Sequence, residues 1–195
     1  MTALALGCSH TAGVGIALAD CYASVLSTLL SVDIDNQGVP AGNSAHVQSN
    51  LVQALTHTRR PDFVIAQWPN PIRRTMWHNN ISKKENIINS SAAFKGLLRM
   101  GEKNFYQPWI DTIVVCNLLC QTASVPIVNI MIEDISQEYH DMLAAEKIVL
   151  HVDRKLPDQT WLMDSAASDR LHHSAVCHKQ WAQRLHGLLN EITTR

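Results

Sequence analysis

A chain of 195 residues has the usual size of one domain and can bury a core without disulfides or structural metals. Hydrophobic residues make up 46% of it and charged residues 17%, a composition that excludes a disordered or fibrous protein. The formal net charge is -1, with no run of like charge, so neither a nucleic acid nor a membrane surface is an expected partner. We therefore expect a single domain over residues 1–195.

The cysteines and the start of the chain bear on its location. Five cysteines form no C-x-x-C pair, so we expect reduced, buried side chains rather than disulfides or a zinc site. The apolar start lacks a basic flank and breaks at Gly7, too early for a signal peptide or a membrane span. A cytoplasmic protein is the simplest interpretation, and its oligomeric state stays open.

The first half of the chain alternates strand and helix patterns. Residues 3–8 form a short apolar run, typical of a buried parallel strand, and residues 16–30 space their apolar side chains as one helical stripe. Residues 32–34 predict a second strand. A helix over 45–57 follows, and Ser44 is placed to cap it.

The second half continues this alternation. Residues 62–68 are apolar and β-branched, as in a central strand, and 70–89 are polar, which predicts a loop with a short helix. The later elements are a helical stretch over 90–123 with a break near Gly101 or Pro108, a strand over 125–132, a helix over 136–145, a strand over 147–152 and a helix over 174–193. Together they predict an α/β fold in which helices cover a parallel sheet of about five strands.

Polar residues suited to catalysis follow the first three of these strands. Reactive groups of such folds lie on loops at the carboxyl ends of the strands. Ser9 comes after Gly7 in a strand-to-helix turn, where a serine hydroxyl can be displayed. Gly42 lets a backbone N–H approach an oxyanion, and Asn70, held between two prolines, offers an amide donor.

A carboxylate and an imidazole stand close together near the C-terminus. Asp169 precedes His172 by three residues, a spacing at which the carboxylate can orient the imidazole and fix its tautomer. The other ring nitrogen is then free to take a proton from Ser9. The alternative for Ser9 and Asp169 is that each caps a helix.

Four short motifs in this order resemble the four signature blocks of the SGNH (GDSL-like) hydrolases. They are a Gly-x-Ser after the first strand, a Gly after the second, an Asn after the third and a C-terminal Asp-x-x-His. The resemblance implies a three-layer α/β/α sandwich with a flavodoxin-like sheet. It also implies that Ser9 is the nucleophile, His172 the general base and acid, and Asp169 its orienting partner.

By the same resemblance, the oxyanion hole combines the backbone N–H groups of Ser9 and Gly42 with the side-chain amide of Asn70. Members cleave carboxyl esters, often acetyl groups on sugars, through an acyl-enzyme and without a metal or other cofactor. The expected partner is thus a small-molecule or carbohydrate ester. Three further residues near the blocks are candidate substrate contacts: His10, Trp68 and Arg73.

This chain departs from the family pattern at several positions. Cys8 stands where an acidic residue is usual, and Trp68 and Pro71 stand where the third block has Gly and Asp. His173 replaces the Pro that often follows the catalytic histidine. The stretch GCSHTAGVGI and the Trp-Pro-Asn-Pro-x-Arg segment resemble the divergent SGNH-like proteins of phage and bacterial genomes.

Two other functions fit parts of the sequence. A zinc hydrolase would use a C-terminal cluster, although the chain has no H-E-x-x-H motif. The candidate ligands are His172, His173, Cys177 and His178. A catalytically silent SGNH-like domain would instead bind a sugar or a protein, with tryptophans as stacking platforms. Those tryptophans are Trp68, Trp77 and Trp109.

Overall fold

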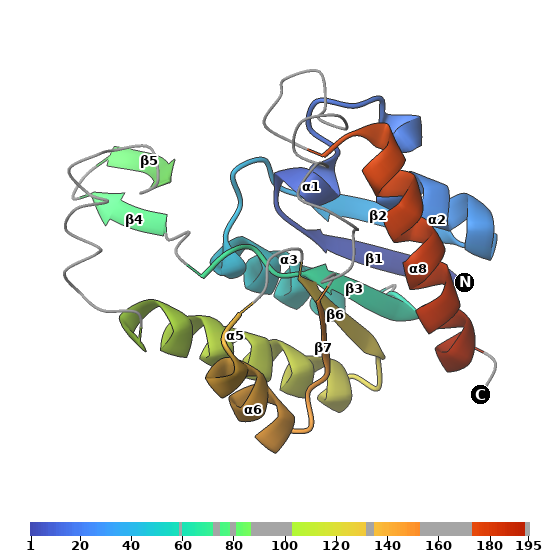
Figure 1. The fold of residues 1–195 in the computed structure, drawn as a ribbon. Helices are drawn as coiled ribbons and strands as arrows, with labels where there is room; N and C mark the ends of the chain where they lie inside the picture. The colour runs from blue at the N-terminus through green and yellow to red at the C-terminus, as the bar shows by residue number, and fades with distance from the viewer. Residues whose placement is uncertain are drawn as a thin grey trace.

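The computed structural model describes residues 1–58, 60–71, 75–78, 81–86, 103–131, 135–152 and 173–193. Within them, five parallel strands form one sheet in the order β2-β1-β3-β6-β7, as in flavodoxin-like folds (Figure 1). The strands are β1 (Thr2–Gly7), β2 (Asp33–Gly38), β3 (Phe63–Gln67), β6 (Ile127–Met131) and β7 (Leu150–Val152). The predicted α/β class and parallel sheet are confirmed.

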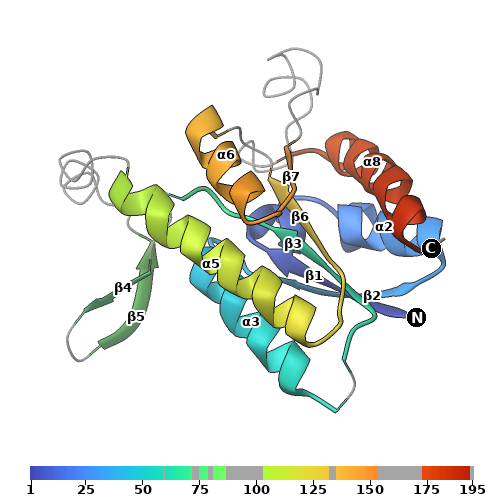
Figure 2. The ribbon, with the colours of Figure 1, turned by 90° about the horizontal axis from the view of Figure 1, so that it is seen from below.

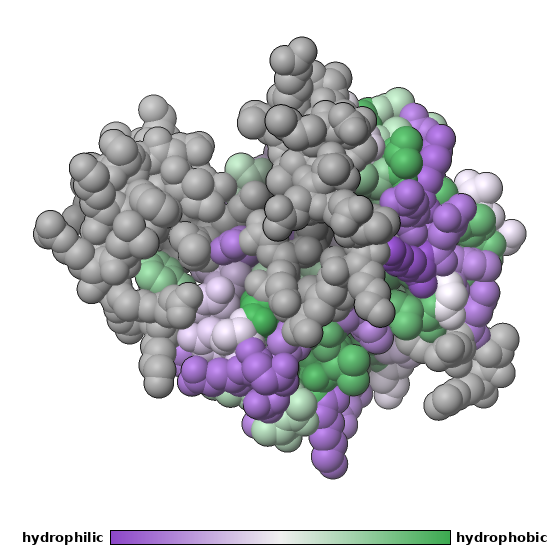
Figure 3. Space-filling view, viewed as in Figure 1, coloured by the Kyte–Doolittle hydropathy of each residue, from purple (hydrophilic) through white to green (hydrophobic). Residues whose placement is uncertain are grey.

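Helices cover both faces of this sheet, which makes three layers (Figure 2). One face carries α3 (Ser44–Thr56), α5 (Lys103–Thr122) and α6 (Gln137–Ala145). The other face carries α2 (Tyr22–Leu30) and α8 (Ala175–Thr193), which pack side by side. Hydrophilic residues gather over α8 where it faces solvent, at the right of Figure 3.

Each central strand supplies both hydrophobic cores, because successive side chains of a strand point to opposite faces. In β1, Leu4 and Leu6 face the α3 side, whereas Ala3 and Ala5 face α2 and α8. Burial on both faces explains why such strands read as continuous apolar runs. The carboxyl ends of β1, β2 and β3 meet at one edge of the sheet, where the predicted site residues follow them.

The second strand is longer and more polar than predicted. The apolar pattern indicated residues 32–34, but β2 spans Asp33–Gly38 and none of its residues is fully buried. It pairs only with β1 in the sheet order, so it is an edge strand that needs no continuous apolar run. The prediction was short because it relied on hydrophobicity alone.

The helix predicted over residues 16–30 is divided. A single 3-10 turn, η1 (Leu18–Asp20), precedes α2, and Cys21 between them has extended backbone with ψ 141°. The Cys21 thiol donates to the carbonyl of Thr11 at 3.2 Å, which ties this break to the loop after β1. The predicted cap of α3 was wrong by one residue: Asn43 caps the helix and Ser44 is its first residue.

Two further differences concern residues 70–123. Part of the predicted loop is an antiparallel pair of strands, β4 (Thr75–His78) and β5 (Ile81–Asn86), and residues 72–74, 79–80 and 87–89 of that stretch lie outside the described residues. The helix α5 continues through Pro108 instead of breaking there, and Gly101 lies outside the described residues. All five cysteines are buried and unbridged, as predicted. Among the helices described, none combines the length and the apolar character that a membrane crossing requires.

Candidate active site

The turn that carries Ser9 begins where β1 ends, at Gly7. Cys8 occupies the N-cap position with extended backbone, and the four-residue helix α1 (Ser9–Ala12) starts at Ser9 itself. The helix ends at Gly13, whose φ of 71° lies in the left-handed region that glycine adopts without strain. Ser9 is 4% exposed, so its side chain lies beneath the surface at the carboxyl edge of β1.

A buried amide holds this turn in place. The Oε1 atom of Gln67, the last residue of β3, accepts from the Cys8 backbone N–H at 3.1 Å and from the Thr11 hydroxyl at 3.0 Å. The Cys8 thiol donates to the same oxygen at 3.2 Å. A Cβ at Gly7 would lie 2.1 Å from Thr11 Oγ1 and 2.7 Å from Gln67 Oε1, so glycine is required there.

A second set of contacts reaches α1 from β2 and α2. The Asn36 side chain donates to the Thr11 carbonyl at 2.7 Å, and the Thr11 hydroxyl lies 3.2 Å from the Tyr22 hydroxyl. Burial raises the pKa of the Tyr22 phenol well above its usual range, so this group stays neutral. The turn therefore rests on a neutral, hydrogen-bonded polar cluster.

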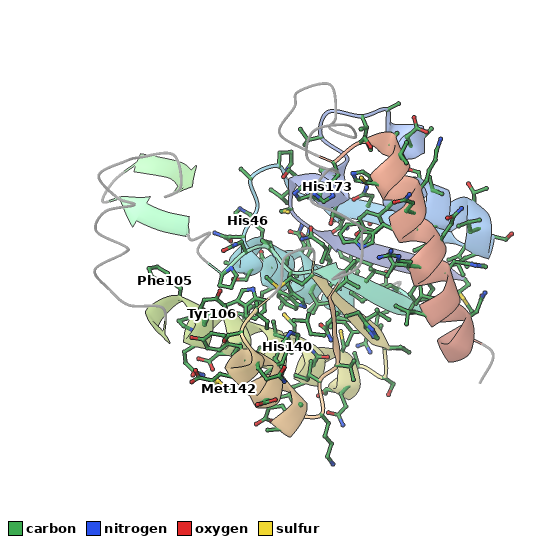
Figure 4. The ribbon with its side chains drawn as sticks, viewed as in Figure 1. His46, Phe105, Tyr106, His140, Met142 and His173 are labelled. Carbon is green, nitrogen blue, oxygen red and sulfur yellow. The ribbon has the colours of Figure 1, made fainter. Side chains whose placement is uncertain are left out.

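Gly42 lies against the same turn. The Val39 N–H donates to the Gly7 carbonyl at 2.9 Å, and a Cβ at Gly42 would lie 3.4 Å from that carbonyl oxygen. In this conformation the Gly42 N–H donates to the Val39 carbonyl at 2.7 Å. Asn43 follows and caps α3, its Oδ1 accepting from the backbone N–H of His46. Figure 4 shows His46 at the start of this helix.

The loop that carries Asn70 is anchored at two points. Trp68 donates through its Nε1 to the Asn129 side chain at 2.9 Å, and Trp109 on α5 donates to the Pro69 carbonyl at 3.0 Å. Asn70 itself is partly buried. Trp68 is 1% exposed, so it belongs to the core and offers no surface to a substrate or a sugar. The same holds for Trp109.

Two segments far apart in the sequence meet beside this edge, one at His10 and the other at His173. The rings of His10 and His173 lie 4.6 Å apart between centroids, tilted by 59°, and Figure 4 shows His173 next to α1. His10 is therefore packed against the residue that follows the predicted base. Asp169, His172 and Arg73 lie outside the described residues.

The start of α8 is fixed to α2 and to η1 just after this contact. Nδ1 of His178 accepts from the Tyr22 N–H at 3.1 Å, and Lys179 forms an ion pair with Asp20 at 3.0 Å. His178 is thus used in packing the helix. Within the part of the chain that the structure describes, no three His, Cys, Asp or Glu side chains gather as a metal site would require.

Solved structures share this architecture, although no family model and no curated protein matches the sequence. A protein of the G-D-S-L family from Desulfitobacterium hafniense DCB-2 is 12% identical, with a TM-score of 0.61 over 95% of this chain and 97% of that chain. The esterase EstA from Pseudoalteromonas sp. is also 12% identical, with a TM-score of 0.64 over 100% of this chain and 99% of that chain. A carbohydrate esterase family 2 enzyme from Corynascus thermopiles is 10% identical, with a TM-score of 0.61 over 100% of this chain and 67% of that chain.

The chain has the SGNH-hydrolase fold. The resemblance seen in the sequence is thereby confirmed at the level of the fold. In this SGNH fold, Ser9, Gly42 and Asn70 follow β1, β2 and β3 at one edge of the sheet.

Sequence reasoning missed two buried residues that support this edge, Gln67 and Asn129. Gln67 and Asn129 are buried polar side chains inside apolar strands, 2% and 3% exposed. A polar residue that interrupts an apolar run is a usable signal, since burial then demands hydrogen-bond partners. Which partners it finds depends on the sheet order, which the sequence pattern does not supply.

Proposed function

We propose that this protein hydrolyses carboxyl esters through an acyl-enzyme formed on Ser9. The observation that carries the proposal is the contact between His10 and His173, because it brings the C-terminal segment to the turn that holds the nucleophile. His172 precedes His173 in the chain, and consecutive Cα atoms are only about 3.8 Å apart. This contact supports the proposal, because the residue that follows the predicted base packs against the residue that follows Ser9.

In the proposed reaction, the Ser9 hydroxyl oxygen attacks the ester carbonyl carbon while the imidazole of His172 takes the hydroxyl proton. The tetrahedral intermediate collapses, the bond to the alcohol oxygen breaks, and His172 returns the proton to the leaving alkoxide. A water molecule, deprotonated by the same imidazole, then attacks the acyl carbon; the bond from that carbon to Ser9 Oγ breaks, the imidazole returns the proton to Ser9, and the carboxylic acid leaves. Asp169 orients the imidazole and stabilises its protonated form.

The developing oxyanion would be held by the N–H groups of Ser9 and Gly42 and by the Asn70 amide. The anchored Trp68-Pro69 backbone supports this role for Asn70, since a donor must be positioned before the charge appears. The Gly42 N–H already donates to Val39, so an oxyanion would share this N–H or replace the Val39 carbonyl as its acceptor.

We propose esters of short acyl groups, including acetyl groups on sugars, as the substrate class. A carbohydrate esterase from Corynascus thermopiles has the same fold, which supports testing acetylated sugars beside simple aryl esters. Hydrolysis of p-nitrophenyl acetate and release of acetate from an acetylated oligosaccharide are the matching assays.

Two pairs of variants test the proposal. Ser9→Ala should lower kcat/KM for p-nitrophenyl acetate by at least about a thousandfold, because it removes the nucleophile. Ser27→Ala is the matched control: its hydroxyl donates to Val32 near the opposite edge of the sheet, and activity should be unchanged. Retained activity in Ser9→Ala would reject the nucleophile.

The adjacent histidines form the second pair. His172→Ala should abolish activity as fully as Ser9→Ala, because nucleophile and base act as a unit. His173→Ala should cost less than about tenfold, since its ring packs on His10 and has no proton-transfer role in the scheme. A reversed order of the two effects would move the base to His173. No loss in either variant would reject the histidine mechanism.

A further inference from the structure

The Gln67 side chain contacts both the turn that carries Ser9 and the loop that leads to Asn70. Gln67 Oε1 accepts three donors from the turn that carries Ser9, namely the Cys8 N–H, the Cys8 thiol and the Thr11 hydroxyl. Its Nε2 donates to the Trp68 carbonyl at 3.1 Å, in the loop that leads to Asn70. The nucleophile turn and the Asn70 loop are therefore linked through a single amide.

The orientation of this amide follows from its neighbours. An amide oxygen only accepts and an amide nitrogen only donates. The reverse orientation would place the NH₂ group against the Cys8 N–H and the amide oxygen against the Trp68 carbonyl, two repulsive pairs. The hydrogen bonds thus fix which way the Gln67 side chain points.

The site is built around this contact. Gln67 is 2% exposed, so loss of its oxygen would leave buried donors without an acceptor, and such donors are costly to bury. Gly7 leaves the space that Gln67 and Thr11 fill, since a Cβ there would overlap both. Position 8 is a cysteine, so the turn has no carboxylate of its own there and takes its acceptor from β3.

We infer that Gln67 is a positioning residue for the ester hydrolase reaction, and that it fixes the separation between Ser9 and the Asn70 loop. This inference rests on the proposed function. Gln67 acts through Cys8, Thr11 and Trp68 and has no role in proton transfer. A displacement of about 1 Å at a catalytic group can cost about a hundredfold in rate.

The test compares Gln67→Met, which keeps the length of the side chain but offers neither an amide oxygen nor an NH₂ group, with Thr11→Val and Thr11→Ser. Gln67→Met should lower kcat about 10- to 100-fold while KM changes less than about threefold, because orientation rather than binding is lost. Thr11→Val should show a smaller loss of the same kind, and Thr11→Ser, which keeps the hydroxyl, should restore kcat. Ser27→Ala controls for loss of a hydrogen bond elsewhere.

A second readout separates this inference from the proposed function. Amide hydrogen exchange of Cys8, followed by NMR, should be about tenfold faster or more in Gln67→Met and unchanged in Ser27→Ala, whether or not the protein is an esterase. Unchanged Cys8 exchange, or full kcat in Gln67→Met, would overturn the positioning role. An inactive wild type with faster Cys8 exchange in Gln67→Met would reject the proposed function and with it a positioning role of Gln67 in catalysis, leaving only its contact with the turn.

Discussion

Replacing Gly38 with alanine tests how closely the end of β2 supports the turn that carries Ser9. A Cβ at Gly38 would lie 2.2 Å from the backbone nitrogen of Ala12 and 2.6 Å from the carbonyl carbon of Thr11. Ordinary contacts of a Cβ begin near 3.4 Å, so α1 would have to move by roughly 1 Å. Both atoms belong to the backbone, and no change of rotamer relieves the overlap.

The expected cost follows from this overlap. Overpacking a close-packed region usually costs about 1–3 kcal/mol, and a backbone clash belongs at the upper end, about 3 kcal/mol. In a chain of this length, 1 kcal/mol shifts Tm by about 2–4 °C, so Gly38→Ala should lower Tm by about 6–12 °C. Ester hydrolysis should fall by about a hundredfold as well, because α1 begins with Ser9.

Gly187→Ala is the matched control for this experiment. Gly187 is exposed on α8, and a Cβ there would meet no atom within 4 Å. Alanine in a helix interior is more favourable than glycine by about 0.5–1 kcal/mol, so this variant should be slightly stabilised. Urea unfolding followed by circular dichroism measures both variants. A Gly38→Ala protein within about 0.5 kcal/mol of wild type would refute the packing described at β2 and α1.

Two further predictions concern buried titratable groups. Burial raises the pKa of Cys116 to about 12 and that of Cys120 to about 11. Iodoacetamide at about pH 8 should therefore leave both thiols unmodified until the protein unfolds. A peptide map that shows either thiol alkylated in the native protein would contradict this prediction. Burial lowers the pKa of His151 below its ordinary 6.5, so protonation favours the unfolded chain and stability is lost as the pH falls through that value. Urea unfolding should therefore show a smaller loss of stability from about pH 7.5 to pH 5.5 in His151→Gln than in wild type. Equal losses in the two proteins would contradict the lowered pKa of His151.

The sequence predicts best what burial on both faces dictates. β1, β3 and β6 are buried on two sides, so their apolar runs identify them within one or two residues. The edge strand β2 obeys no such rule, and the strands β4 and β5 come from a polar stretch that the pattern assigned to a loop. The edge strand β7 was predicted from its apolar pattern, over residues 147–152 against the observed Leu150–Val152, so hydrophobicity fails only where a strand is polar.

The candidate site shows a similar division. Gly7, Ser9 and Asn70 can be picked out because their residue types suit a tight turn, a nucleophile and an amide donor. The contacts of Gln67 could not be predicted in this way, because its partners Cys8 and Thr11 lie 59 and 56 residues away in the sequence. The contact of His10 with His173 joins more distant segments still. Such pairs emerge only when the order of the strands is known.

The proposed nucleophilic role of Ser9 is tested most directly by phosphonylation followed by peptide mass mapping. The EstA structure that shares this fold is one inhibited by monoethylphosphonate, so an activated ethyl phosphonate ester is the matching reagent. The expected result is a single adduct on Ser9 that accompanies loss of esterase activity and is absent from Ser9→Ala. An adduct on a different residue, or inactivation with Ser9 unmodified, would contradict the mechanism.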